Sequence, residues 1–235
     1  MQPRTQRGPP NCIKGTCNDA DQVRTAVDSW NDEIRDTAAY ELAARGQIPM
    51  QALAFYLESM RYLFYHSERS MGYAVSRCAE LGDHGLEQYF KAKVHEENGH
   101  DRWPQNDLDH LPEGCVLGVE PAGAIRRLVE LQARALAEHP ICLLAYAVWA
   151  EYMTACLGAE TVAMLVSGGY ERGQLSTITN HVDADGEHAI RGFAELDSLW
   201  SGQVSAEAIF NVVKQACQLF SEFCVEIHDC ARRVA

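Results

Sequence analysis

The chain has 235 residues, of which 47% are hydrophobic and 23% charged, an ordinary balance for a globular protein of one or two domains. The formal net charge of −13 argues against non-specific binding to nucleic acid or to an anionic membrane surface. Apolar runs such as residues 141–150 are too short to span a bilayer, and the polar, proline-rich N-terminus has no apolar signal core. We therefore expect a cytoplasmic protein.

In chain order, residues 1–17 hold prolines, glycines and basic residues without periodicity and are expected to form a disordered tail. Residues 18–235 show apolar positions at helical spacing, with no alternating strand, repeat or linker, and are expected to form a single domain. The predicted fold class is all-α, a bundle of seven to eight helices. The predicted helices cover about 19–44, 49–80, 86–110, 121–138, 140–158, 159–167, 173–200 and 205–233.

Two of these helices carry features with structural consequences. Pro104 should kink the helix at 86–110, because a proline leaves the carbonyl group four residues earlier without its helical partner. The helix at 140–158 is apolar nearly all round, so it is expected to be central and buried, and Gly158 is expected to end it.

Nine cysteines are scattered along the chain, and their positions favour buried, reduced thiols over a disulfide framework. Cys12 and Cys17 lie in the tail and form a weak candidate metal or redox pair, because no second pair completes a zinc site.

The stretch around residues 180–198 contains His181, Asp185 and His188, an H-x3-D-x2-H spacing. On a helix these positions fall within a stripe of roughly 60°, so two imidazoles and a carboxylate share one face. Neutral imidazole and ionised carboxylate are the side chains that hold iron, manganese or zinc. One stripe cannot complete a metal site, so other helices must supply further ligands.

Two other predicted helices supply them. Glu97 and His100 form an E-x2-H pair, which repeats the carboxylate-x2-His spacing by which helical bundles hold two metals. Glu151 is the single charge in the middle of the apolar helix, where a carboxylate is costly unless it is paired or metal-bound. Mixed nitrogen and oxygen ligands without thiolate favour Fe(II) or Mn(II). The predicted metal and catalytic residues are Glu97, His100, Glu151, His181, Asp185 and His188.

Simpler interpretations of each element stay open. Glu96 is a register alternative to Glu97, because a residue four positions before His100 also faces it. Asp185 and His188 are also compatible with a solvated helix face, and Glu151 with a buried carboxylate held by Tyr152 or an arginine.

These residues resemble the haem-oxygenase-like di-iron oxidases and oxygenases. The resemblance lies in residues 93–111, KVHEENGHDRWPQNDLDHL, together with a glutamate on a central helix and the H-x3-D-x2-H element, and it extends over about residues 48–232. It implies a haem-oxygenase-like bundle, two Fe(II) per chain on the six residues named above, and O2 as co-substrate.

The resemblance also implies a function. Members of this superfamily commonly oxidise amino acids or related carboxylic acids in specialised metabolism, by N-oxygenation, decarboxylation, other C–C cleavage or nitrile formation. The expected partners are a small-molecule substrate of this kind and a second copy of the chain in a homodimer, with neither nucleic acid nor membrane.

Two other classes remain as alternatives. Haem-oxygenase-like bundles include metal-independent thiaminase-like hydrolases and quinone-cofactor synthases, which need no set of six metal-type ligands. A ferritin-like iron-binding protein would use the E-x2-H and D-x2-H pairs with a carboxylate such as Glu68, but does not usually place a histidine at the position of His181.

Overall fold

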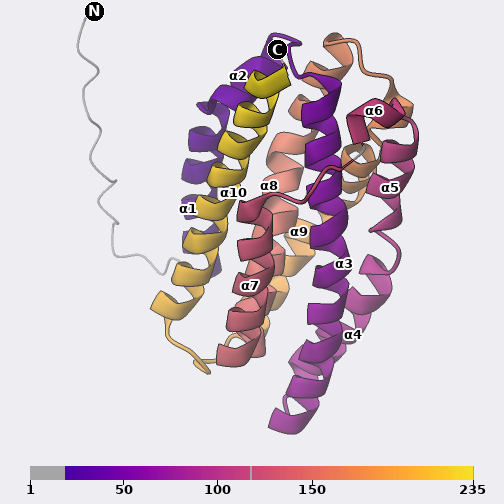
Figure 1. Cartoon of the computed structure of the whole chain (residues 1–235). Helices are drawn as coiled ribbons and strands as arrows, with labels where there is room; N and C mark the ends of the chain where they lie inside the picture. The colour runs from indigo at the N-terminus through magenta and orange to yellow at the C-terminus, as the bar shows by residue number, and fades with distance from the viewer. Residues whose placement is uncertain (1–18, 117, 235) are drawn as a thin grey trace, which may run out of the picture.

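The structure, a computed structural model, describes residues 19–116 and 118–234, and the predicted tail at 1–17, with Cys12 and Cys17, lies outside these residues. All regular elements in the described part of the chain are helices, which form one bundle (Figure 1). The helices are α1 Asp19–Arg35, α2 Ala38–Ala44, α3 Met50–Leu81, α4 His84–Glu97, α5 Arg102–Asp109, α6 Glu113–Val116, α7 Gly123–Glu138, α8 Pro140–Ser167, the 3-10 turn η1 Arg172–Gln174, α9 Ser176–Leu199 and α10 Ala206–Val234.

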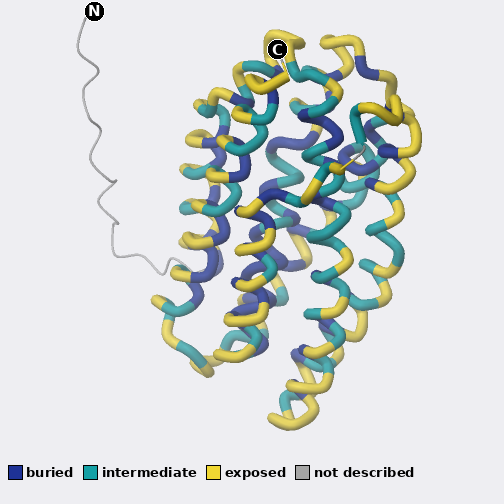
Figure 2. Tube along the Cα trace, in the orientation of Figure 1, coloured by how far each residue is buried: buried dark blue, intermediate teal, exposed yellow. Residues whose placement is uncertain are grey.

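Helix α8 is the core of the bundle, as its apolar sequence predicts. In the view of Figure 1, α3, α7 and α10 lie in front of it, and its most extensive packing partner is α9. Among the described residues it alone is long and apolar enough to cross a membrane, but most of it is buried, as in the core helix of a soluble fold. The buried residues line the inner faces of the surrounding helices (Figure 2).

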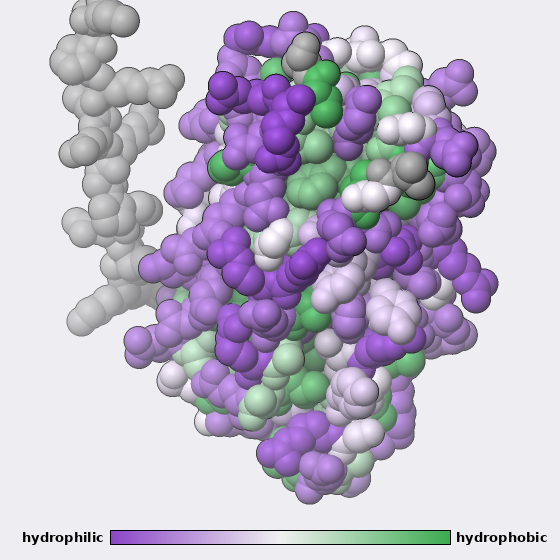
Figure 3. Space-filling view, viewed as in Figure 1, coloured by the Kyte–Doolittle hydropathy of each residue, from purple (hydrophilic) through white to green (hydrophobic). Residues whose placement is uncertain are grey.

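On the face seen in Figure 3, hydrophilic residues predominate, and hydrophobic residues show in patches between them. The seven described cysteines are free thiols, four of them buried, which confirms the expectation of reduced cysteine for this part of the chain.

The described residues form more helices than the seven or eight predicted, because two predicted helices are interrupted and α6 is additional, while the two helices predicted at 140–158 and 159–167 are the single helix α8. The helix expected at 19–44 is two helices, separated where the side chain of Thr37 accepts a hydrogen bond from the backbone N–H of Tyr40 and caps α2. The helix expected at 86–110 ends at Glu97, and α5 begins at Arg102.

The expected kink at Pro104 is therefore wrong. Pro104 lies in the first turn of α5, where a backbone N–H has no helical partner and its loss costs nothing. The break falls at residues 98–101, where Gly99 has a φ of 88°, a left-handed conformation that favours glycine. As a result, His100 lies in a turn and not on a helix.

The expected end of a helix at Gly158 is also wrong, because α8 continues unbroken to Ser167. Gly158 instead allows close packing, since a Cβ atom there would lie 2.4 Å from Cγ2 of Val182 on α9. Gly192 on α9 has the same role, because a Cβ atom at that position would lie 2.9 Å from Cγ2 of Val148. Two glycines, one on each helix, thus let α8 and α9 approach closely along the faces that carry Glu151 and Asp185.

Candidate metal centre

The candidate centre is built from α4, the turn after it, α8 and α9. Helix α9 contributes His181, Asp185 and His188 along one face, as the spacing predicts. Asp185 is 5% exposed, and its Oδ1 lies 3.6 Å from Nδ1 of His188. All three side chains therefore belong to the inner half of the helix surface.

The ring of His181 is held in one orientation. Its Nδ1 lies 2.7 Å from the carbonyl oxygen of Thr177, one helical turn earlier. Because a carbonyl only accepts, the proton sits on Nδ1 and the lone pair of Nε2 is free. Burial lowers the pKa of His181, so the imidazole is neutral near neutral pH. This is the tautomer and protonation state of a metal-binding histidine.

Aromatic rings enclose this imidazole. The ring of Phe64 on α3 stacks on His181 at a centroid distance of 4.7 Å, and Trp103 on α5 meets it edge-on at 4.9 Å. Trp103 also stacks on His100 at 3.9 Å. The rings of His100 and His181 therefore lie close, at 5.2 Å between centroids.

Glu97, the last residue of α4, lies beside these two histidines. Its Oε2 is 3.0 Å from Nδ1 of His100, although the two residues do not share a helix. Burial alone raises the pKa of Glu97, but the imidazole of His100 and the ammonium of Lys93 outweigh it, so the pKa lies below its usual value. Glu97 is therefore an ionised carboxylate next to two imidazoles.

Glu151 on α8 has a partner that the sequence did not suggest. The ammonium of Lys93 on α4 donates a hydrogen bond to its Oε1, while Tyr152 donates to Asp28 instead. The other oxygen, Oε2, is buried without a hydrogen-bond partner in the described part of the chain. Burial raises the pKa of Glu151, and Lys93 only partly offsets this rise.

Three carboxylates crowd the centre. Burial, followed by the charges of Glu151 and Glu97, raises the pKa of Asp185 to about 8. Burial is the largest cause of this rise, and the two neighbouring carboxylates add to it. The buried carboxylates, one of them with an oxygen unpartnered among the described residues, and the neighbouring imidazoles fit a metal ion, and their nitrogen and oxygen atoms fit iron or manganese.

A buried carboxylate outside the centre fixes the start of α9. Asp107 on α5 is fully buried, and its two oxygens accept hydrogen bonds from the backbone N–H groups of Ser176 (2.9 Å) and Thr177 (2.7 Å). A carboxylate at a helix N-terminus satisfies free N–H groups and the helix dipole together. Asp107 thereby positions the turn that carries Thr177 and His181.

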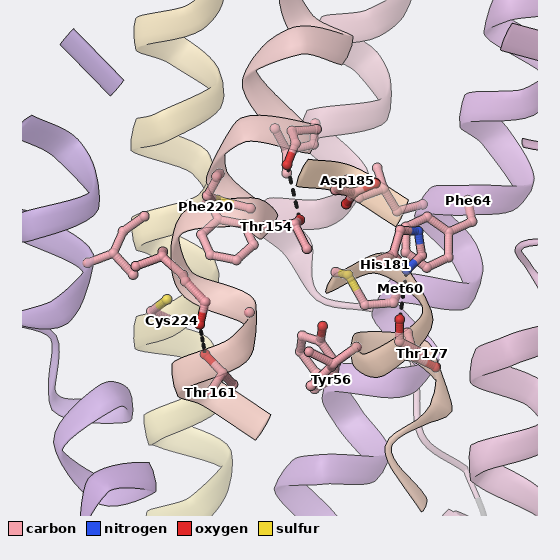
Figure 4. Close-up of a pocket in the computed structure, with 18 of the residues that line it drawn as sticks. Tyr56, Met60, Phe64, Thr154, Thr161, Thr177, His181, Asp185, Phe220 and Cys224 are labelled. Atoms are coloured by element: carbon pink, nitrogen blue, oxygen red, sulfur yellow. Dashed lines mark hydrogen bonds between the residues drawn. The ribbon is translucent and has the colours of Figure 1, made fainter. Parts of the chain in front are cut away.

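A cavity of about 230 Å³ opens beside the centre. Figure 4 shows His181 and Asp185 at one side of it, with Phe220 and Cys224 across the cavity. Its lining is mostly apolar, and the acidic residues among the lining side chains are Glu97, Glu151 and Asp185. The cavity is therefore a mostly apolar space with carboxylates and an imidazole in its wall.

The structure thus places all six predicted residues around one region, but it does not bring them into a finished metal site. Among the described residues no three His, Cys, Asp or Glu side chains are grouped tightly enough to enclose an ion. Binding a metal would require side-chain rotation, first of all at Glu97 and His100, which contact each other. The role of all six residues as metal ligands stays a prediction. Glu96 faces Lys93 and Arg191 instead, at 2.8 and 2.7 Å.

Sequence reasoning missed three residues of this region: Lys93, Trp103 and Asp107. A signal existed for Lys93, because it precedes Glu97 by four positions and so lies on the same helix face. Trp103 follows His100 by three positions, a spacing that brings side chains together on a helix, but its contact with His181 depends on the packing of α5 against α9. Asp107 offered no local signal, since its partners are 69 and 70 residues away.

Comparisons with known proteins define the fold. The structure matches a domain of unknown function with a haem-oxygenase-like fold from Shewanella denitrificans OS217, with a TM-score of 0.79, 16% identity, and coverage of 88% of this chain and 91% of that one. It also matches haem oxygenase-1 from the cyanobacterium Synechocystis sp. PCC6803, solved in complex with haem, with a TM-score of 0.72, 14% identity, and coverage of 93% and 96%. No protein-family model and no curated protein matches the sequence.

The chain therefore has a haem-oxygenase-like, all-α fold, as the resemblance implied. At these identities the likeness shows the fold and not the activity. The function has to be argued from the residues of the centre and its cavity.

Proposed function

We propose that this protein is an O2-dependent non-haem iron oxidoreductase that acts on a small, largely apolar amino acid or carboxylic acid. The observation that carries the proposal is the meeting of Glu97, His100 and His181, two imidazoles and an ionised carboxylate, beside a mostly apolar cavity that Glu97 and His181 line. A 2-His-1-carboxylate set with open positions is typical of non-haem Fe(II) oxygenases.

Each of these side chains has a specific task in the proposal. Nε2 of His181 is available as a donor because Thr177 holds the proton on Nδ1. Glu97 supplies negative charge that balances a divalent cation. Trp103 holds the ring of His100 and, with Phe64, shields both histidines from water. When bound, iron would supply the activation of O2.

The cavity limits the substrate. A volume of about 230 Å³ lies below the roughly 300 Å³ at the lower end of pockets for drug-sized ligands, so a small molecule fits better than a haem. Its mostly apolar lining, with Met60, Phe64 and Phe220, favours a hydrocarbon body. The polar head of the substrate would then face the carboxylates and imidazoles.

Among the described residues, the lining includes neither arginine nor lysine, so none of these side chains offers a cation to a substrate carboxylate. Of the three arginines near the predicted motifs in sequence, Arg69 lies over the ring of Tyr65, Arg77 pairs with Glu80 and Arg191 pairs with Glu96. In the proposal the carboxylate or amine of the substrate therefore binds at the metal end of the cavity.

A second candidate function is metal-independent catalysis in the same cavity. It is favoured by the pairing of Lys93 with Glu151, which partly neutralises a buried carboxylate without a metal. The two candidates differ in whether the histidines carry a cofactor.

Oxygen uptake tests the proposal. Protein loaded with Fe(II) without oxygen is mixed with O2 and a panel of short apolar amino acids and carboxylic acids, and O2 consumption is recorded. We expect at least one compound to raise the rate at least tenfold in the wild type and not in His181→Ala. His95→Ala, which changes a histidine of α4 outside the predicted ligand set, is the control and should behave as wild type. Turnover of a compound by metal-free protein would support the second candidate instead.

A further inference from the structure

Lys93 is a buried lysine inside the candidate centre. Its side chain is 3% exposed, and its Nζ lies 2.8 Å from Oε2 of Glu96 and in direct contact with Oε1 of Glu151. The neighbouring lysine on the same helix, Lys91, is about half exposed and pairs with Glu87 at the surface. Lysines are almost never fully buried unless they are paired, and the burial of Lys93 depends on its pairing with Glu96 and Glu151.

The carboxylates and imidazoles divide into two groups around it. The first group is Glu97, His100 and His181, in which a carboxylate contacts one imidazole and the two rings lie 5.2 Å apart. The ammonium of Lys93 contacts no member of this group through an ion pair or hydrogen bond in the described residues.

The second group is Glu151, Asp185 and His188. Lys93 contacts Glu151 directly, and its positive charge acts on Asp185 and His188 as well as on Glu97 of the first group, with which it makes no direct contact. Glu151 and Asp185 are buried, so a cation in this group is held by low-dielectric attraction rather than by solvent-exposed pairing. The ammonium of Lys93 therefore already supplies positive charge where a second metal ion would bind.

We propose that the ammonium of Lys93 takes the place of a second metal ion, so that this chain binds one iron, at Glu97, His100 and His181. The inference rests on the proposed function for the presence of iron, and it revises the expectation of two irons per chain. A divalent ion in the second group would have to approach a fixed positive charge and remove the partner of Glu151. Both effects oppose its binding.

Iron counting tests the inference. Protein is dialysed against Fe(II) without oxygen, and iron per chain is measured by elemental analysis, with Mössbauer spectra to show whether irons are coupled in pairs. We expect one uncoupled iron in the wild type. Lys93→Met, which keeps the length of the side chain and removes its charge, is expected to take two coupled irons, and Lys93→Arg one.

The controls separate the inference from the proposed function. Lys91→Met changes a surface lysine of the same helix and should bind one iron. His181→Ala should lose the iron, and any iron it retains is bound at another site. Circular dichroism and thermal melting establish that each variant is folded.

The outcomes are distinguishable. Two coupled irons in the wild type, or a single iron in folded Lys93→Met, would overturn the role of Lys93 and leave the iron oxidoreductase proposal standing. Wild type that binds no more iron than His181→Ala would overturn both. If Lys93→Met fails to fold, the wild-type and Lys93→Arg counts still decide between one iron and two.

Discussion

Asp107 on α5 accepts a hydrogen bond of 2.7 Å from the backbone N–H of Thr177 on α9, so a buried carboxylate fixes the start of the helix that carries three predicted ligands. The carbonyl of the same Thr177 accepts from Nδ1 of His181. Thr177 thus links Asp107 on α5 to the orientation of the His181 imidazole.

Asp107→Ala should therefore destabilise the protein. It removes the partners of two backbone N–H groups at a buried helix end, which costs about 3 kcal/mol of unfolding free energy. Chemical denaturation measures this change, and Asp109→Ala, at an exposed position of the same helix, is the control. Equal stability of the two variants would show that α9 is positioned by other contacts.

Trp103 should control iron affinity through His100. Its ring stacks on the imidazole at 3.9 Å, so Trp103→Ala leaves that ring free to rotate. Residues that orient metal ligands typically contribute about 10–100-fold to affinity, and we expect the Kd for Fe(II) to rise at least about tenfold. Trp103→Phe keeps an aromatic surface and should recover most of the affinity. An unchanged Kd in Trp103→Ala would contradict the orienting role.

The contact of α8 with α9 at Gly158 should tolerate no side chain. Gly158→Ala places a Cβ atom 2.4 Å from Cγ2 of Val182, and valine is too stiff to move aside. We expect a loss of about 1–3 kcal/mol in stability, restored by adding Val182→Ala. Gly186→Ala on α9 is the matched control, because a Cβ there meets nothing within 4 Å, and it should stabilise by up to about 1 kcal/mol.

The metal-free protein should lose stability as the pH rises from about 4 to 8. The pKa of Asp185 is about 8 in the folded chain against about 3.9 for an unperturbed aspartate, so the folded state holds a proton that the unfolded chain has released. Asp185→Asn removes this titrating group and should flatten the fall. The measurement is urea denaturation at about pH 5, 7 and 8.5, from above the unfolded pKa to just above the folded pKa, in the presence of a chelator. A pH dependence identical in the two proteins would contradict the raised pKa.

Much of the fold could be predicted from sequence because its signals are local. The apolar run of α8 predicted a central buried helix, and the spacing of His181, Asp185 and His188 predicted a shared face, which the structure shows. The helix boundaries could not be predicted as well. Gly158 lies inside α8 because it packs against Val182 on α9, and a contact between two helices cannot be seen in the local sequence.

The candidate centre was harder to predict than the fold. Its six residues could be selected because metal ligands have few chemical types and helical spacings. Their mutual geometry could not, because Glu97 and His100 are separated by a turn at Gly99 and the partner of Glu151 comes from another helix. The spacing of Lys93 and Glu97 placed the ammonium on the right face of α4, but its contact with Glu151 on α8 joins residues 58 positions apart and could not be predicted.

The most direct test of the account is an anomalous diffraction map at the iron absorption edge, from crystals loaded with Fe(II) without oxygen. We expect one peak between the side chains of Glu97, His100 and His181, with Lys93 still in contact with Glu151. No peak at these three residues, in crystals whose loading solution contains saturating Fe(II), would contradict it.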